Sequence, residues 1–347
     1  MLLPREFAKA VVPAGTTTLI IDPHEISNVL GLQGISFMRE AIQGLPIDVY
    51  MMLPSCVPAT PFETSGFDLN SYDLSLLIDK PWVLGIAEMM NFPGVLNLDS
   101  NVMAKLKLAE AKGKRIDGHA PCLSDKDLCA YIAAGVASDH ECTTPDEAIE
   151  KLRKGMYLMI REGSAAKDLR ALLPVLKEKN TRKCIFVTDD RHPEDLLEHI
   201  NSMVRIAVEA GVPVIKAIQM ASLNTAEYFN IPNLGAIAPG YKADFVVLPD
   251  LKSFKPDLVF KKGKLVAEKG KLITDITKNE IPAVRGSVNV KWIKYEDFKI
   301  EAHGNIVRAI EVIPHQLITK SVESEIKVVD GFAESNLETD TLKICVI

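Results

Sequence analysis

The stretch KRIDGHAPCLSDKDLCAYIAAGVASDHECTTPDEAIEKLRKGMYLMIREGS, residues 114–164, alternates short apolar runs with amphipathic segments. The runs at 114–121, 135–141 and 156–164 have the length and composition of buried strands. Residues 124–134 and 143–155 between them have the periodicity of helices, and the second segment opens with a capping threonine, a proline and early acids. Such alternation predicts parallel strands joined by helical crossovers.

The same alternation extends in both directions from this stretch. Further apolar runs lie at 16–22, 46–53, 82–88 and 184–190, and further helical patterns at 27–41, 101–112, 167–176 and 195–210. A closed barrel of this class needs eight strands, and the sequence supplies seven, after an amphipathic helix at 2–12. The predicted fold class is therefore α/β, a (β/α)8-type barrel lacking its first strand, which we expect upstream of Met1.

The pattern changes in the last third of the chain. A helix over 213–231 is followed by short strands between Gly, Pro and Asp turns, and then by alternating segments such as VNVKWI, IVRAIEVI, EIKVVDG and LKICVI. We predict three parts: an incomplete barrel over 1–230, a small β unit over 231–284, and the start of a C-terminal α/β or β domain over 285–347. The second part is expected to be an attached β-sandwich.

Composition narrows the class of protein. Apolar residues make up 47% and charged residues 25% of the 347 residues, with a net charge of −6. This composition is typical of a globular protein and argues against nucleic acid as a partner. No uncharged apolar segment reaches the roughly 18 residues of a membrane span. Six scattered cysteines without a CxxC pair indicate reduced thiols and a cytoplasmic chain.

Histidines and acids gather where the predicted strands end, which is where (β/α) barrels carry their active sites. A single histidine at such a place is more often a hydrogen-bonded or surface residue, but many acids and imidazoles on one rim predict a site. His and carboxylate ligands suit Zn, Mn or Fe(II), whereas a closed structural zinc site would need paired thiols. The residues at these ends are Asp22, His24, Glu25, Glu88, His119, His140, Glu141, Glu162, Asp189, Asp190, Arg191 and His192.

Other chemistries lack their motifs. There is no glycine-rich phosphate loop, no G-x-S-x-G elbow and no CxxC-containing deaminase signature. Ser164, in REGS, is therefore expected to be a hydrogen-bonding loop residue rather than a nucleophile.

A family resemblance extends over most of the chain. The collinear motifs that carry it are IDPHEISNVLG, MLPSCVPATPFETSG, GIAEMMNFPGV, IDGHAP, AGVASDHECTT, IREGSAA, VTDDRHPEDL, AIQMASLNTAEYF and GAIAPGYKADFVVL. With these motifs the sequence resembles bacterial adenine deaminases of the amidohydrolase superfamily, which implies a metal-dependent barrel with an attached β-sandwich. The implied reaction converts adenine and water to hypoxanthine and ammonia, as in purine salvage, by metal-activated hydroxide attack at C6.

The resemblance also implies roles for individual residues. The metal ligands would be Glu88, His119, His140 and Asp189, around Mn(II) or Fe(II), with Zn as an alternative, and binuclear in the complete family site. The catalytic residues would be Asp189, Asp190 and His24. The substrate-binding residues would be Glu25, Glu162, Ser164 and His192. We expect adenine as the small-molecule substrate, a homo-oligomer, and neither nucleic acid nor membrane as partner.

One departure from the family pattern leaves alternatives open. The superfamily places a His-x-His pair at the end of its first strand, and no such pair occurs in this sequence. Its expected place precedes Met1, and the family continues beyond Ile347, so we expect a chain truncated at both ends. Losing two ligands would weaken the metal site, so residues 1–347 alone are expected to be a poor deaminase or an inactive amidohydrolase remnant. A different amidohydrolase reaction, on a cyclic amide or an N-acetyl group, is the other alternative.

Overall fold

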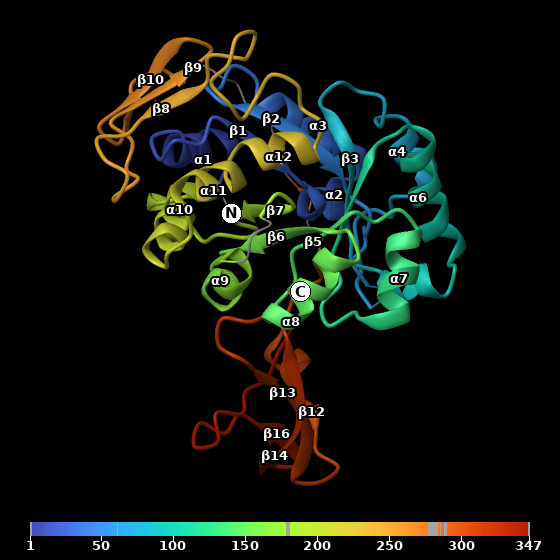
Figure 1. Cartoon of the computed structure of the whole chain (residues 1–347). Coiled ribbons are helices and arrows are strands. Elements are labelled where there is room, and N and C mark those ends of the chain that lie inside the picture. The colour runs from blue at the N-terminus through green and yellow to red at the C-terminus, as the bar shows by residue number, and fades with distance from the viewer. Residues whose placement is uncertain are drawn as a thin grey trace. The chain divides into compact units, whose positions relative to one another are not determined.

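The computed structural model describes residues 2–60, 62–177, 181–276, 284, 286, 287 and 290–345. It divides into two compact units, the first ending at Val284 and the second running from Arg285 to the C-terminus. The first unit contains every parallel strand and the candidate site (Figure 1).

All seven strands predicted for the barrel are present. They pair in parallel and in sequence order, as β1-β2-β3-β4 and as β5-β6-β7. A backbone hydrogen bond of 3.0 Å from Ala137 N–H to the Ile116 carbonyl joins the two groups. The strands are β1 (Thr18–Ile21), β2 (Asp48–Leu53), β3 (Val83–Met89), β4 (Arg115–Gly118), β5 (Ser138–Asp139), β6 (Tyr157–Arg161) and β7 (Cys184–Val187). The α/β class is confirmed and fits a barrel; an eighth strand before Met1 stays a prediction.

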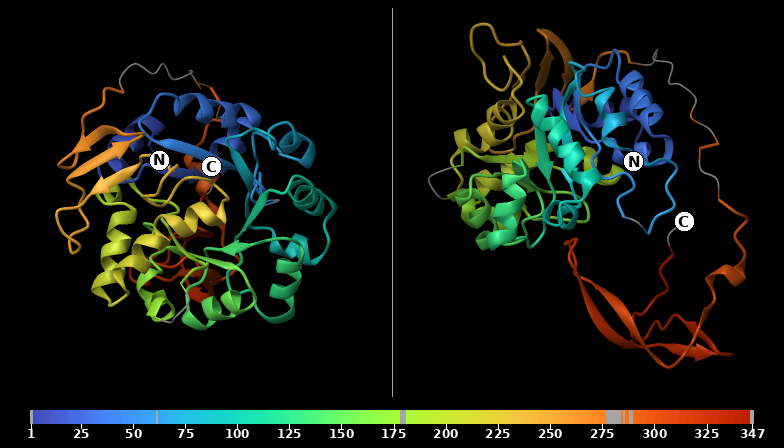
Figure 2. Two further views of the ribbon diagram at one scale, coloured as in Figure 1. Left: turned by 45° about the horizontal axis from the view of Figure 1, so that its top comes forward. Right: turned by 90° about the vertical axis from the view of Figure 1, so that its right-hand side faces the viewer.

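Helices lie outside these strands. The helices labelled α6 to α10 are at the periphery of Figure 1, and the same segments are at the periphery of the left view of Figure 2. Side chains alternate between two apolar layers: Leu158 and Ile160 pack outward under the helices, whereas Tyr157 and Met159 pack inward. The helices of this unit are α1 (Pro4–Val11), α2 (His24–Leu30), α3 (Leu32–Ala41), α4 (Ser71–Ser75), α5 (Phe92–Leu96), α6 (Ser100–Ala111), α7 (Asp125–Ala133), α8 (Pro145–Arg153), α9 (Leu169–Lys177), α10 (Ile200–Glu209), α11 (Val214–Met220) and α12 (Leu223–Tyr228).

Three predicted helices differ from the observed ones. The helix expected over 27–41 is two helices, because Gly31 between them has φ +58°, a conformation that only glycine adopts readily. The helix expected over 195–210 is a 3-10 turn, Pro193–Leu197, and then α10, separated by Glu198 and His199, whose dihedral angles are non-helical. The helix expected over 213–231 is broken at Ser222, which has non-helical dihedral angles, into α11 and α12.

Four short strands follow in the first unit as one antiparallel sheet of order β11-β10-β9-β8. Lys262 and Gly263, both with positive φ, form the tight turn between the middle strands, as hairpin turns require. The strands are β8 (Phe245–Val247), β9 (Leu258–Lys261), β10 (Lys264–Glu268) and β11 (Lys271–Leu272). The described part of 231–284 contains this one sheet, whereas a sandwich needs two. The predicted sandwich and its boundaries therefore stay predictions.

The second unit is built of antiparallel strands. Its main element is a hairpin of β13 (Ile306–Val312) and β14 (Thr319–Glu325), paired over seven residues on each side. A 3-10 turn at Tyr295–Phe298 precedes a small sheet of β12 (Ile300–Glu301), β15 (Lys327–Val329) and β16 (Phe332–Glu334). IVRAIEVI and EIKVVDG thus contain strands, whereas 290–293 of VNVKWI and 342–345 of LKICVI are not in a strand. The remaining residues of these two segments lie outside the described residues.

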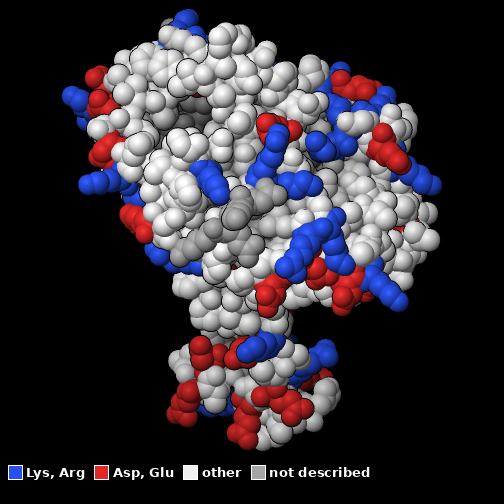
Figure 3. All heavy atoms as spheres, viewed as in Figure 1, with Lys and Arg blue, Asp and Glu red and all other residues white. Residues whose placement is uncertain are grey.

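Charged side chains of both signs are interspersed on the face of the molecule that Figure 3 shows. Among the residues described, no helix has the length and apolarity needed to cross a membrane.

Candidate metal centre

Three side chains meet at the carboxyl ends of neighbouring strands. Glu88 lies near the end of β3, His119 directly follows β4, and His140 directly follows β5. One oxygen of Glu88, Oε2, lies 2.7 Å from His119 Nδ1 and 3.1 Å from His140 Nε2. The two imidazole rings are 5.2 Å apart, edge to face. Because parallel strands end at one edge, residues far apart in sequence converge here.

A second group adjoins Glu88 from Asp22, which directly follows β1, and from the first turn of α2. His24 Nδ1 lies 2.9 Å from Asp22 Oδ2 and 3.5 Å from Glu88 Oε1. His24 Nε2 lies 3.7 Å from Glu25 Oε1. The imidazole of His24 is thus surrounded by three carboxylates, one of which also belongs to the first group.

A third group adjoins the first through Glu141, whose Oε1 lies 3.5 Å from His119 Nδ1. Glu141 Oε1 is 3.1 Å from His140 Nε2, and Glu141 is also hydrogen-bonded by both terminal nitrogens of Arg161. Arg161 Nη1 donates to Asp189 Oδ2 at 2.7 Å. Asp189 follows β7 with φ +52°, a left-handed conformation that aspartate tolerates better than most residues. Ligand atoms of His140, Glu141 and Asp189 lie within 4.8 Å of one another.

Arg161 was not predicted as a site residue, although the sequence contains a signal for it. Tyr157 and Met159 face the inner layer of the barrel, so period-two alternation along β6 places Arg161 on the same inner face. Its side chain is 1% exposed, and a guanidinium buried that deeply needs acidic partners. Glu141 was noted at a strand end but was not assigned a role, and it is one of those partners.

Burial and proximity shift the protonation of these groups. Burial opposes charge at Glu88, yet hydrogen bonds from His119 and His140 hold the pKa of its carboxyl well below the usual range. Burial likewise disfavours the imidazolium of His140, yet its hydrogen bonds to Glu141 and Glu88 raise its pKa well above the usual range. Hydrogen bonds from His140 and Arg161 lower the pKa of Glu141 to about 2, against the effect of burial.

Asp22 and His24 show the same balance between burial and charge. Burial raises the pKa of Asp22 to about 6. Burial disfavours the charged form of His24, but the hydrogen bond to Asp22 and the charges of Asp22, Glu25 and Glu88 raise its pKa to about 10. The acidic groups therefore stabilise the protonated imidazoles. A bound cation would supply the positive charge in place of those protons.

The donor set fits a divalent cation. Ligand atoms of Glu88, His119 and His140 lie within 4.8 Å of one another, as do those of Asp22, His24 and Glu88. Carboxylate oxygens and imidazole nitrogens, without a cysteine, are the ligands that Zn, Mn and Fe(II) accept. The groups Asp139–Cys142–Glu147 and His140–Glu141–Asp189 satisfy the same distance criterion, but Lys151 already neutralises the first of these two with an ammonium 3.0 Å from Asp139.

The remaining predicted site residues lie in the loops after β6 and β7. Ser164 donates a hydrogen bond to Asp195 and accepts one from the backbone N–H of His192 at 2.8 Å. The side chain of His192 is 66% exposed, and Glu162 accepts from Leu169 N–H at 3.3 Å. Burial, together with the charge of Asp189, raises the pKa of Asp190. Among the residues described, no hydrogen bond or ion pair joins Glu162, Ser164 or His192 to Glu88, His119 or His140.

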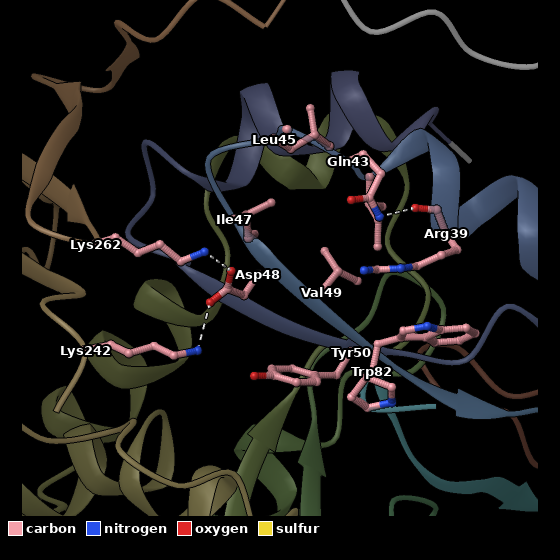
Figure 4. Close-up of a pocket in the computed structure, with 13 residues that line it drawn as sticks. Arg39, Gln43, Leu45, Ile47, Asp48, Val49, Tyr50, Trp82, Lys242 and Lys262 are labelled. Atoms are coloured by element: carbon pink, nitrogen blue, oxygen red, sulfur yellow. Dashed lines mark hydrogen bonds and ion pairs between the residues drawn. The ribbon is translucent and has the colours of Figure 1, made fainter. Parts of the chain in front are cut away.

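A separate cavity of about 450 Å³ lies away from these residues, at the start of β2. Trp82, Tyr50 and Arg39 line it together with Asp48, which is paired with Lys242 and Lys262 (Figure 4). Asp48 is the first residue of β2 and Trp82 directly precedes β3, so the cavity lies at the amino ends of these strands, opposite to the ends that carry Glu88, His119 and His140. The cavity and the candidate centre are therefore distinct features.

Comparison with known proteins is consistent with this geometry. Residues 1–266 match the model of the amidohydrolase family. The chain is 52% identical over 348 residues to adenine deaminase 2 of Carboxydothermus hydrogenoformans, an alignment that covers 100% of this chain and 61% of that protein. It is 46% identical over 349 residues to an adenine deaminase of Desulfatibacillum aliphaticivorans, with the same 100% and 61% coverage. The chain thus spans about three fifths of the length of these curated relatives.

Solved structures share the fold at low identity. An N-acetylglucosamine-6-phosphate deacetylase from Pasteurella multocida has a TM-score of 0.54 at 15% identity, over 76% of this chain and 79% of that one. A triazine hydrolase variant has a TM-score of 0.53 at 16% identity, over 78% of this chain and 72% of that one. At such identities the likeness concerns the fold alone.

Proposed function

The chain belongs to the amidohydrolase family, and from that premise we propose that it serves the hydrolytic deamination of adenine to hypoxanthine and ammonia. The observation that carries the proposal is the convergence of Glu88, His119 and His140 at one rim of the barrel. The names and the 45–52% identity of the curated relatives supply the substrate.

The residues proposed to hold a divalent metal are Glu88, His119, His140 and Asp189. Mn(II) or Fe(II) is the proposed ion, with Zn as the alternative, because the donors are carboxylates and imidazoles. When bound, such an ion supplies a Lewis acid that lowers the pKa of water and so provides a nucleophile at neutral pH.

Asp189 is the proposed proton carrier of the reaction. Its Oδ2 accepts from Arg161 at 2.7 Å, whereas its Oδ1 makes no hydrogen bond with any residue that the structure describes. One oxygen therefore fixes the carboxylate and the other is available for proton transfer. Addition of water forms a C6–O bond, and loss of ammonia breaks the C6–N6 bond. Water gives up two protons in all, of which one ends on N1 of hypoxanthine. Asp189 would take the other and deliver it to the departing nitrogen.

His24 and Asp190 are proposed to assist this transfer. With a pKa of about 10, His24 is an imidazolium at neutral pH, and it lies beside Glu88. A cation there can hydrogen-bond to a substrate nitrogen as negative charge develops on the purine ring. The raised pKa of Asp190, next to Asp189, makes it a second group that can hold a proton.

Glu25, Glu162, Ser164 and His192 are proposed to bind the purine edge. Glu25 adjoins His24, whereas Ser164 and His192 lie together in the loops after β6 and β7. These loops are at the carboxyl ends of the strands, where barrels hold their substrates. Selection of adenine would come from donors and acceptors that stay unpaired when another base binds, which costs free energy.

The proposed setting is purine salvage in the cytoplasm, with a homo-oligomeric enzyme. The thiols of Cys56, Cys122, Cys129, Cys142 and Cys184 are not in disulfides, which supports a reducing compartment.

Ammonia release from adenine by the purified chain, with and without added Mn(II), tests this function. We expect slow, Mn(II)-dependent release of ammonia and hypoxanthine in equal amounts, because the sequence contains no His-x-His pair to complete the ligand set. Asp189→Asn should abolish this release, because it keeps the size of the side chain but cannot carry the proton. Lys262→Gln, beside the separate cavity of Figure 4, is the matched control and should retain the parent rate.

A panel of substrates separates the alternatives. Hydrolysis of a cyclic amide or an N-acetyl sugar in place of adenine would replace the proposed reaction by another of the same family. Stoichiometric Mn(II) binding without turnover of any substrate would contradict catalysis by this chain while leaving its metal site intact.

A further inference from the structure

We propose that the buried ion pair of Asp139 and Lys151 is a positioning clamp that fixes His119 and His140 relative to each other. The clamp consists of Asp139 at the end of β5 and Lys151 on α8. It deepens the proposed function, because the two imidazoles are proposed metal ligands, but the contacts that define it involve only this chain.

Asp139 joins the backbones next to both histidines. Its Oδ1 accepts from the N–H of Ala120, the residue after His119, at 2.8 Å. Its Oδ2 accepts from the N–H of Glu141, the residue after His140, at 3.0 Å. One carboxylate therefore sets the distance between the two peptide segments that carry the imidazoles.

Lys151 completes the clamp from the helix side. Its ammonium donates to the Ala120 carbonyl at 2.7 Å, to Asp139 Oδ2 at 3.0 Å and to Glu147 Oε1 at 2.7 Å. Ala120 is consequently held at both its N–H and its carbonyl. All three donor positions of the ammonium are used, so its orientation is fixed.

The depth of the pair argues for a role in geometry. Asp139 is 0% exposed and Lys151 is 1% exposed. Desolvation of two charges offsets much of their attraction, and a buried ion pair is weak evidence for stability because apolar residues often replace it without loss. Its hydrogen bonds to Ala120 and Glu141 are directional, however, and an apolar pair could not make them. Outer partners of this kind set the orientation of metal-binding histidines.

Tyr131 connects the third proposed ligand, Glu88, to the same series of buried hydrogen bonds. The N–H of His119 donates to the Tyr131 hydroxyl at 3.1 Å, and that hydroxyl donates to the carbonyl of Met89 at 2.7 Å. Met89 is the residue after Glu88. Buried polar groups thus connect the backbones beside Glu88, His119 and His140 in series.

The test compares Lys151→Met with Lys261→Met in the full chain. Lys261 is a matched control because it is 5% exposed and is also paired with two carboxylates, Asp48 Oδ2 at 3.0 Å and Asp244 Oδ2 at 2.6 Å. It lies by the separate cavity at the amino ends of the strands, where Figure 4 labels its partner Asp48. Both variants should lower the midpoint of urea unfolding, since each leaves buried carboxylates without a cation.

Two readouts distinguish positioning from general stability. The Mn(II) dissociation constant, from competition with a chelator, should rise at least tenfold in Lys151→Met and stay within twofold of the parent in Lys261→Met. In the metal-free chain, the imidazole ¹⁵N resonances of His119 and His140 should shift in Lys151→Met only. Their assignment comes from His119→Gln and His140→Gln.

Each outcome decides the proposal. Imidazole resonances that move in both lysine variants, or in neither, would overturn it. A parent chain that binds no Mn(II) would contradict the proposed metal function, while the metal-free resonances would still decide the clamp. Asp139→Asn is measured in parallel and replaces Lys151→Met if Lys151→Met does not fold. The amide of asparagine keeps the size of the side chain but has only one acceptor oxygen.

Discussion

Arg161 and Asp189 form an ion pair of 2.7 Å between Nη1 and Oδ2, although the arginine side chain is 1% exposed and the aspartate side chain 34% exposed. The same guanidinium contacts Glu141 and lies 3.5 Å from Asp168. Asp189 is thus held from inside the barrel while its other oxygen remains accessible. The arginine connects the ends of β5, β6 and β7, which carry the acidic part of the candidate centre.

We predict that Arg161→Lys lowers the rate of adenine deamination about 10- to 100-fold and stability by about 1–3 kcal/mol. Lysine keeps the charge but cannot reach Glu141 and Asp189 with a planar fork. The measurements are ammonia release with Mn(II) and urea unfolding.

Arg205→Lys is the matched control for this variant. Arg205 contacts Glu198 and Glu209, and its side chain is 28% exposed. The same replacement should therefore cost less than about 1 kcal/mol and leave the rate unchanged. Equal rates for Arg161→Lys and Arg205→Lys would show that Arg161 does not orient Asp189.

We predict that Mn(II) affinity increases with pH between about 6 and 8, by roughly tenfold per pH unit for each proton released. Burial opposes the charged ring of His140, yet its hydrogen bonds to Glu141 and Glu88 raise its pKa well above the usual range, so in the metal-free chain this ring keeps its proton to higher pH than an ordinary imidazole. A metal ligand must be a neutral imidazole, hence binding expels the proton and is favoured at higher pH.

Calorimetric titration in buffers of different ionisation enthalpy measures the number of protons released. Glu88→Gln provides the comparison: it removes one of the carboxylates that hold the proton on His140, so fewer protons should be released even though binding is weaker. An affinity independent of pH would contradict the assignment of His140 as a ligand.

The strands and the rim residues could be predicted from sequence because both follow from local patterns. Apolar runs bounded by turns predicted all seven parallel strands, and the polar residue after each run then falls at one rim by topology alone. Glu88, His119 and His140 required only that reasoning and the family resemblance.

The missed features depend on contacts between distant segments. Arg161 reads as an ordinary polar end of a strand until its three acidic partners, from other elements, are in place. Lys151 lies on a helix with acids at regular spacing, and nothing local indicates that it passes inward to the Ala120 carbonyl. The breaks at Gly31 and Ser222 are single-residue backbone conformations that apolar periodicity does not report.

We predict that Gly118→Ala destabilises the chain by about 3 kcal/mol or more, because its methyl group would clash with backbone. A Cβ at this position would lie 2.2 Å from the Ser138 carbonyl oxygen, on the neighbouring strand. β4 would have to move away from β5, and His119 would move with it. The midpoint temperature of thermal unfolding and the affinity for Mn(II) should both decrease.

Gly113→Ala is the control for this substitution. Gly113 has φ +59° and nothing within 4 Å of its added Cβ, so its cost is limited to backbone strain of about 1 kcal/mol. If the Gly118→Ala and Gly113→Ala variants had the same stability, β4 and β5 would not approach each other as closely at Gly118 as the structure shows.

We predict that a buried histidine distant from the centre makes the fold sensitive to acid. Burial, with a smaller contribution from Arg191, lowers the pKa of His199 to about 3. Because the folded pKa is below the unfolded value of about 6.5, the folded state disfavours protonation. The stabilisation is complete above pH 6.5 and is lost as pH falls towards 3, by about 3 kcal/mol between pH 6.5 and 4.

His199→Asn should remove this dependence on pH. When the pH is lowered from 6.5 to 4, the free energy of unfolding in urea should decrease by about 3 kcal/mol less in this variant than in the parent. Thr16→Val separates titration from packing: the Thr16 hydroxyl lies 2.7 Å from His199 Nδ1, and its loss should cost about 1–3 kcal/mol at every pH without flattening the profile. A parent profile as flat as that of His199→Asn would mean that His199 is not buried as a neutral ring.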